Sequence, residues 1–316
     1  MESLDFYLQD KKTVAIAGHV KPDGDCEGST LAVYNYIKNN YPDVSVTLYL
    51  EPIPNIFKFL QRSDEIVSDY PKCEAHDLFI ALDCGDLGRL GEAAGYFEAA
   101  KHTLCIDHHV SNQSFADDNY IVGDASSTCE LVFDLLDERK LTKQIAECLY
   151  TGIIHDTGVF QYSCTSSKTM NIAGKLMDLG IDYPTIVDKT FFECTFEQNQ
   201  ILGTALLKAK RHFDNACISS IITKEDMEHC HALPKHLEGI VAKLRSTKDV
   251  HVAVFIYETP KGQQKVSLRS DEAVDVAAIC VKYGGGGHVR AAGVTMDGNP
   301  EEILEVILKD IDEQLS

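Results

Sequence analysis

Histidine and acidic residues gather near the start of the chain in GHVKPDGDCEGS, residues 18–29, directly after the apolar run TVAIA. His19, Asp23 and Asp25 together could bind a divalent cation, because imidazoles and carboxylates are common ligands of borderline and hard metals. The same stretch could instead cap a helix, with Asp25 accepting from free N–H groups and Pro22 turning the chain. A cap needs one aspartate, so this stretch leaves both interpretations open.

Three further clusters place acids or histidines where an apolar run stops. FIALDCGD has Asp83 after a predicted strand, LCIDHHVSN has Asp107, His108 and His109 after another, and GIIHDTGVF has Asp156 at a predicted helix end. Taken singly, these residues could be caps, turn residues or ordinary histidines. Together they favour a functional site, since the carboxyl ends of parallel strands open onto one crevice where ligands bind.

The ligand types in these clusters favour manganese over zinc when no thiolate takes part. Six or more ligands are too many for one ion that must keep positions for water. Two ions about 3.5 to 4 Å apart, bridged by a carboxylate, would use them all. The clusters therefore predict a site for two metal ions.

Alternating strand-like and helical patterns must position these clusters. Helical patterns begin near residue 28 and recur at 55–60 and 91–100, between strand-like runs at 13–17, 44–50, 77–83 and 102–107. Strands that alternate with helices predict parallel βαβ units. Three more helical patterns follow, and the last ends at Gly180 as a C-cap glycine would. We expect an α/β fold with a parallel, doubly wound N-terminal domain over residues 1–192.

The pattern restarts after a predicted linker helix within residues 193–213, and it indicates a smaller C-terminal α/β domain over residues 214–316. Four consecutive glycines in this domain, 284–287, directly precede His288. Glycines alone favour a flexible loop. With His288 beside them and Arg269 on the preceding strand, they favour a phosphate site, because arginine grips phosphate in a planar fork and glycine lets backbone N–H groups approach.

The composition limits the classes of function. The chain has 316 residues, 44% of them hydrophobic, and a net charge of −20. Such a charge disfavours long nucleic acid, whereas bound metals would still admit short nucleotides. Eleven cysteines without a CxxC pair argue against a disulfide framework. No apolar stretch approaches the length of a membrane span, and the polar start MESLDFYLQDKK lacks signal-peptide character. We expect a cytoplasmic protein without a membrane partner.

The four clusters resemble, in order, the four motifs of the DHH phosphoesterase family, and SLRS followed by GGGGHVRAAG looks like the substrate-binding domain of its nucleotide-cleaving branch. The resemblance runs from about Val14 to Gly293. It implies hydrolysis of short oligoribonucleotides, including linear dinucleotides, to mononucleotides and of 3'-phosphoadenosine 5'-phosphate to AMP. A pyrophosphatase-like hydrolase and a non-catalytic dinucleotide sensor are the alternatives. The oligomeric state stays open, with a homodimer among the options.

The resemblance also implies a role for each site residue. His19 and Asp23 would hold one Mn²⁺, with Asp25, His108 and Asp156 holding a second and Asp83 bridging the two. His109 would face the scissile phosphate, and Asp107 would be an orienting residue behind the site. The chemistry of the residues themselves, apart from the resemblance, predicts a substrate contact for Arg89, which follows the Asp83 cluster, and for Arg269, Gly285, Gly286, Gly287 and His288.

Cys26 departs from this family pattern, since small alanine-like residues are usual at its position. A thiol there could bind a softer ion or sensitise the enzyme to oxidation. It could equally be a buried, inert cysteine.

Overall fold

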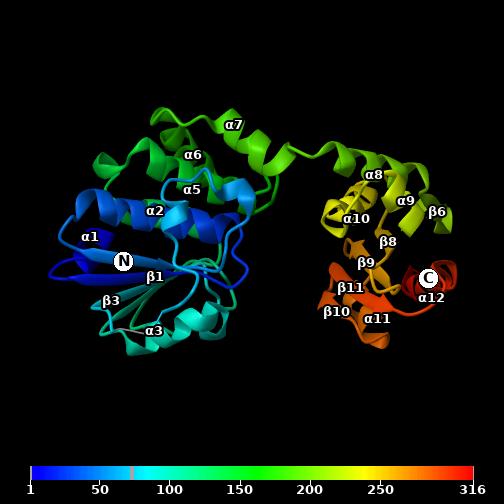
Figure 1. Ribbon diagram of the computed structural model, residues 1–316, viewed down its shortest axis with the longest axis horizontal. Coiled ribbons are helices and arrows are strands. Elements are labelled where there is room, and N and C mark those ends of the chain that lie inside the picture. The colour runs from blue at the N-terminus through cyan, green and yellow to red at the C-terminus, as the bar shows by residue number, and fades with distance from the viewer. Residues whose placement is uncertain (1, 72–74, 316) are drawn as a thin grey trace. The chain divides into compact units, whose positions relative to one another are not determined.

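The computed structural model describes residues 2–71 and 75–315, and the chain divides into two compact units, Met1–Glu193 and Cys194–Ser316. Each unit has its own β-sheet and its own hydrophobic core (Figure 1). Among the described helices, none is both long enough and apolar enough to cross a bilayer.

The N-terminal unit is built on a parallel five-stranded sheet with the order β2-β1-β3-β4-β5. The predicted parallel, doubly wound α/β fold is therefore confirmed. The central strands consist almost wholly of buried residues, as expected when helices cover both faces of a sheet. The strands are β1 (Thr13–Ala17), β2 (Ser45–Tyr49), β3 (Leu78–Leu82), β4 (Thr103–Asp107) and β5 (Asp118–Ile121).

Helices cover the two faces of this sheet, with α2, α5 and α6 over one face and α3 over the other (Figure 1). Alternate residues of β1 enter the two cores: Val14 and Ile16 lie in the larger one, and Ala15 and Ala17 lie in the core beneath α3. The helices are α1 (Leu4–Tyr7), α2 (Gly24–Asn40), α3 (Ala94–Ala99), α4 (Thr128–Leu135), α5 (Lys143–Asp156), α6 (Ser167–Asp178) and α7 (Tyr183–Val187).

Helix α2 starts earlier than the sequence pattern indicates. Asp23 is its N-cap, and the side chain accepts from the backbone N–H groups of Asp25 and Cys26. The predicted capping role thus belongs to Asp23, and Asp25 lies in the first helical turn.

The close approach of α2 and α5 depends on glycine. A Cβ on Gly28 would lie 2.5 Å from the backbone oxygen of Cys148, and one on Gly152 would lie 2.8 Å from Oδ1 of Asp25. Because neither glycine carries a side chain, the helices can pack tightly behind the first turn of α2.

The C-terminal unit contains a mixed six-stranded sheet with the order β10-β11-β9-β8-β7-β6. Its two faces carry separate cores, one with α11 and α12 and the other with α8 and α10. The strands are β6 (Lys210–His212), β7 (Cys217–Ile222), β8 (Val252–Glu258), β9 (Gln264–Ser270), β10 (Gly286–His288) and β11 (Ala291–Met296). The helices are α8 (Phe196–Leu207), α9 (Lys224–His229), α10 (Ile240–Arg245), α11 (Val276–Lys282) and α12 (Pro300–Leu315).

Residues 193–213, interpreted above as a linker helix, contain α8 and β6. Ile201 and Ala205 of α8 are completely buried in a core of the C-terminal unit, and β6 pairs with β7 at the edge of its sheet. Most of this segment is thus packed into the C-terminal unit.

Candidate metal centre

Three adjacent strands deliver the predicted ligands to one edge of the N-terminal sheet. His19 follows β1, Asp83 follows β3, and Asp107 ends β4 directly before His108 and His109. The strand order places β3 between β1 and β4, so these residues meet where parallel strands leave the sheet.

Asp83 lies at the middle of this edge and is 2% exposed. One carboxylate oxygen, Oδ2, is 3.4 Å from Nε2 of His19, and the other, Oδ1, is 3.6 Å from Nε2 of His108. The hydroxyl of Thr128 also donates to Oδ1. Each oxygen of Asp83 therefore faces a different histidine.

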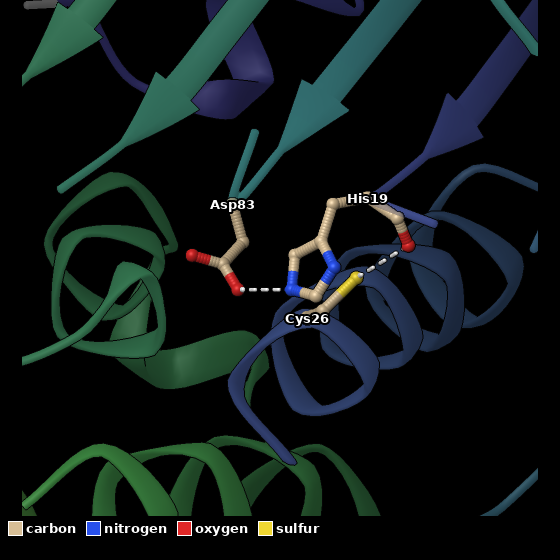
Figure 2. A group of neighbouring side chains, drawn as sticks. All are labelled: His19, Cys26 and Asp83. Carbon is tan, nitrogen blue, oxygen red and sulfur yellow. Dashed lines mark hydrogen bonds and ion pairs between the residues drawn. The ribbon is translucent and has the colours of Figure 1, made fainter. Parts of the chain in front are cut away.

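His19 lies in the first group of candidate ligands. Its Nε2 is 3.6 Å from Oδ2 of Asp23, in addition to its contact with Asp83. Donor atoms of His19, Cys26 and Asp83 all lie within 4.8 Å of one another, and Figure 2 shows the thiol beside the His19–Asp83 pair. The first group thus includes a sulfur atom.

Asp25, His108 and Asp156 form the second group, with donor atoms within the same 4.8 Å limit. Nε2 of His108 is 3.1 Å from Oδ2 of Asp156 and 3.9 Å from Oδ2 of Asp25. Asp25 is completely buried and accepts from the backbone N–H groups of Thr128 and Cys129 at 2.6 and 2.9 Å. These N–H groups belong to the start of α4, where an anion is favoured.

The pKa shifts of the candidate ligands show that their carboxylates lie close together and are buried. Burial, together with the negative charges of Asp83 and Asp156, raises the pKa of Asp25 well above its usual range. Burial would lower the pKa of His19, but hydrogen bonds to Asp23 and Asp83 outweigh it and raise the pKa to about 10. Imidazole and carboxylate donors that converge in this way fit divalent metal ions.

His109 pairs with Asp107 and also belongs to a third group, since donor atoms of Asp83, His108 and His109 lie within 4.8 Å of one another. Nδ1 of His109 is 2.7 Å from Oδ1 of Asp107, and the amide of Asn112 donates to Oδ2 of Asp107 at 2.7 Å. Asp107 is completely buried, whereas the His109 side chain is 43% exposed. The hydrogen bond to Asp107 raises the pKa of His109 despite partial burial. At the open side of the site, this hydrogen bond thus favours the protonated form of His109 over that of a free histidine.

Arg89 approaches the site through His19. Its guanidinium lies 3.0 Å from Nδ1 of His19, which is also 2.9 Å from the backbone oxygen of Val20. Nδ1 can accept from this guanidinium only when it is unprotonated, and it can donate to Val20 only when it carries a proton. The structure thus places Arg89 against a candidate ligand.

The predicted phosphate residues of the C-terminal unit share one sheet face. Arg269 on β9 pairs with Ala291 on β11, which in turn pairs with His288 on β10, so both side chains project from the same side. Lys265 lies four residues before Arg269 on β9 and also projects from this side. The face therefore presents two basic side chains, Lys265 and Arg269, together with the exposed His288.

Arg269 lines a cavity of about 510 Å³ on this face. Phe255 and Tyr257 also line it, with ring centroids 5.9 Å apart. Such a combination can bind a flat apolar group next to an anion.

The glycine run turns into β10 close to the neighbouring strand. A Cβ on Gly285 would lie 2.4 Å from the backbone oxygen of Gly293, and one on Gly287, which has φ +145°, would lie 2.4 Å from that of Ala291. At Gly286 nothing lies within 4 Å. Two of these glycines are thus required by packing, and Gly286 leaves open space above the backbone.

The chain matches two known protein domains. The DHH family N-terminal domain matches residues 13–153, and the DHHA1 domain matches residues 202–316. The chain belongs to the DHH family. The first match contains every residue of the candidate metal centre except Asp156, and the second contains Arg269 and His288.

Relatives of this DHH chain extend over most of its length. It is 28% identical to the bifunctional oligoribonuclease and PAP phosphatase NrnA of Thermus thermophilus, covering 96% of this chain and 90% of the relative. It is also 28% identical to the protein of the same name from Bacillus subtilis, covering 90% and 89%. Among solved structures, an exopolyphosphatase-related protein from Bacteroides fragilis matches with a TM-score of 0.84 and 26% identity, covering 98% of this chain and 94% of that one. Family and relatives together support a phosphoester hydrolase.

Sequence reasoning missed three side chains of the DHH protein. Asn112 holds Asp107, and Thr128 touches Asp83 while its N–H binds Asp25. Lys265 shares the sheet face with Arg269. Asn112 could have been suspected because it lies in the LCIDHHVSN cluster itself. Thr128 could not, since its partners Asp83 and Asp25 lie 45 and 103 residues away in the sequence.

Proposed function

We propose that this protein is a manganese-dependent, two-metal phosphoesterase that hydrolyses short oligoribonucleotides to mononucleotides and 3'-phosphoadenosine 5'-phosphate to AMP. The observation that carries the proposal is the carboxylate of Asp83, whose two oxygens face His19 and His108 separately. A carboxylate so placed can bridge two ions. The names of the relatives support the substrates.

The proposed ligands divide between the two histidines. His19 and Asp23 would hold one ion, Asp25, His108 and Asp156 would hold the other, and Asp83 would touch both. Divalent ions in such a pair lower the pKa of bound water and offset charge on the phosphoryl oxygens. Thr128 and the start of α4 hold Asp83 and Asp25 in place for this task.

His109 would bind the phosphoryl group directly. Its Nδ1 is engaged by Asp107, so Nε2 is the ring nitrogen left to donate to a substrate oxygen. The hydrogen bond to the buried Asp107 raises the pKa of His109, and Asn112 keeps Asp107 oriented. This arrangement would stabilise negative charge as it develops.

The C-terminal unit would contribute a nucleotide-binding surface of its own. Arg269, with Lys265 and His288 on the same face, supplies charge for a phosphate, and Phe255 and Tyr257 offer an aromatic wall for a base. The open space above Gly286 admits a ligand close to the backbone. A substrate contact by Arg89 remains part of the proposal, beside its contact with His19.

We assign the reaction to the cytoplasm, with short nucleotides as partners. Ten described cysteines are all free thiols, which suits a reducing compartment.

A hydrolysis panel with added Mn²⁺ tests the proposal. The substrates are a diribonucleotide, 3'-phosphoadenosine 5'-phosphate, pyrophosphate, bis-p-nitrophenyl phosphate and a strand of about 25 nucleotides. We expect fast release of mononucleotide from the first and AMP from the second. Preferred cleavage of pyrophosphate would instead identify a pyrophosphatase, and tight nucleotide binding without turnover would identify a sensor.

A further inference from the structure

Cys26 is the sulfur donor next to the candidate metal centre. It lies in the first turn of α2 and is completely buried. Its Sγ lies beside Gly18, directly after β1, because a Cβ placed on Gly18 would lie 2.2 Å from it, and the thiol donates to the backbone oxygen of His19 at 3.9 Å. Helix α2 thus directs this thiol toward the strand ends where His19 and Asp83 lie (Figure 2).

The distances are close to those of a coordination sphere. Nε2 of His19 and Oδ2 of Asp83 are 3.4 Å apart, and Sγ of Cys26 completes a group whose donor atoms all lie within 4.8 Å. Ligand atoms around a tetrahedral zinc ion lie about 3.4 to 3.8 Å apart, given metal–ligand bonds of about 2.0 to 2.3 Å. Side-chain shifts of about 1 Å would therefore bring the three donors onto one ion.

The second group of ligands differs in chemistry. Asp25, His108 and Asp156 offer nitrogen and oxygen alone. Cys129, although also buried and within reach of the backbone of Asp25, belongs to none of the groups found among the described residues. Burial near the site therefore does not by itself make a thiol a candidate ligand.

We propose that Cys26 is a ligand of the ion held by His19 and Asp83, and that it makes this position prefer thiophilic ions such as zinc and cobalt over manganese. Thiolate is a softer donor than imidazole or carboxylate, so the two positions would differ in metal preference. As the sulfur–metal bond forms, the thiol proton passes to solvent. This inference rests on the proposed two-metal function, and it modifies the sequence-based expectation of two manganese ions.

Cobalt alone is a suitable probe, because thiolate ligation of Co²⁺ gives a charge-transfer band in the near ultraviolet. The metal-free full chain with Cys194→Ala is the background, since Cys194 is an exposed thiol that could bind cobalt by itself. We expect the band to appear on titration with Co²⁺ and to vanish in Cys26→Ala. Cys148→Ala, which removes another buried thiol of the same unit, should keep it.

Competition between Zn²⁺ and Mn²⁺, followed by metal analysis, gives a second readout. Cys26→Ala should lower the preference for zinc about 10- to 100-fold, the range seen when groups that support a metal are lost. Cobalt binding without a charge-transfer band in the background chain would overturn the inference even if Cys26→Ala does not fold. An unchanged zinc-to-manganese ratio in a folded Cys26→Ala would do the same. Failure to bind any of these metals would instead refute the proposed function.

Discussion

Asp83 has a backbone φ of +56°, a conformation that residues with side chains rarely adopt. Strained positions of this kind persist where the surroundings hold them in place, and they concentrate at functional sites. Here the strain turns the chain sharply at the end of β3, and the carboxylate enters the gap between His19 and His108. Oδ2 of Asp83 therefore meets His19, and Oδ1 meets both His108 and His109.

Removal of this carboxylate should affect both metal positions. We expect Asp83→Ala to lose more than 90% of the activity with Mn²⁺ while staying folded, since even indirect support of a metal is usually worth 10- to 100-fold. Bound manganese per chain should fall as well. A purified variant with more than about a tenth of wild-type activity would rule out a bridging role.

The charge of His109 predicts a pH dependence. Its pKa is raised by Asp107, so the imidazolium persists at higher pH than in a free histidine and is lost as pH rises through the raised value. Removing the negative charge in Asp107→Asn should lower that pKa. The alkaline limb of the kcat/KM profile should then move to lower pH. Identical profiles for the variant and the wild type would show that the charge of His109 does not limit the reaction.

Elements differ in how well the sequence predicts them. Strands β1, β3 and β4 could be located because strands buried on both faces are continuous apolar runs, and the edge strand β2 because its buried residues are apolar. Strand β5 (DNYI) could not, because it is a half-buried edge strand with polar residues. Strand β10 (GGH) has no strand-like residues and is defined by pairing with β11. The candidate ligands could be found because they end apolar runs, whereas the supporting contacts of Thr128 depend on tertiary packing.

The packing of α2 against α5 predicts a stability effect at Gly28. A methyl group there would lie 2.5 Å from a backbone oxygen, so the helices must separate. We expect Gly28→Ala to cost about 1 to 3 kcal/mol in free energy of unfolding. That corresponds to a fall in Tm of several degrees in a scan.

Gly174 of α6 provides the matched control, because a methyl group on it would meet nothing within 4 Å. Gly174→Ala should be neutral or stabilising by up to about 1 kcal/mol, since alanine favours helix more than glycine does. Equal destabilisation in the two variants would mean that the contact with α5 is not the cause.

At the scale of the whole molecule, the metal centre and the basic sheet face belong to different units. This division predicts that substrates of different size use different parts of the protein. Arg269→Ala should weaken oligonucleotide binding by about 2 to 5 kcal/mol if the contact is desolvated. Hydrolysis of bis-p-nitrophenyl phosphate, which is too small to need a second contact, should barely change.

Arg290→Ala is the control for charge, because Arg290 is an exposed residue of the same unit that pairs with Glu272 at 2.8 Å. It should leave both substrates nearly unaffected. If Arg269→Ala impaired the small diester as much as the oligonucleotide, Arg269 would have a structural role instead.

The net charge of −20 predicts a preference for short substrates. A long strand would have to pass its phosphates over an acidic surface, whereas a di- to pentanucleotide makes only a few phosphate contacts. Few phosphate contacts also mean weak salt dependence, since each contact on a single strand contributes about 0.7 log units of affinity per decade of salt.

The measurement is competition between a dinucleotide and a strand of about 25 nucleotides, at equal concentrations of ends and at low and high salt. We expect the dinucleotide to be hydrolysed with the higher kcat/KM at both salt concentrations. Comparable values for the two substrates with a steep salt dependence would reveal an extended binding track, as in a processive single-strand exonuclease.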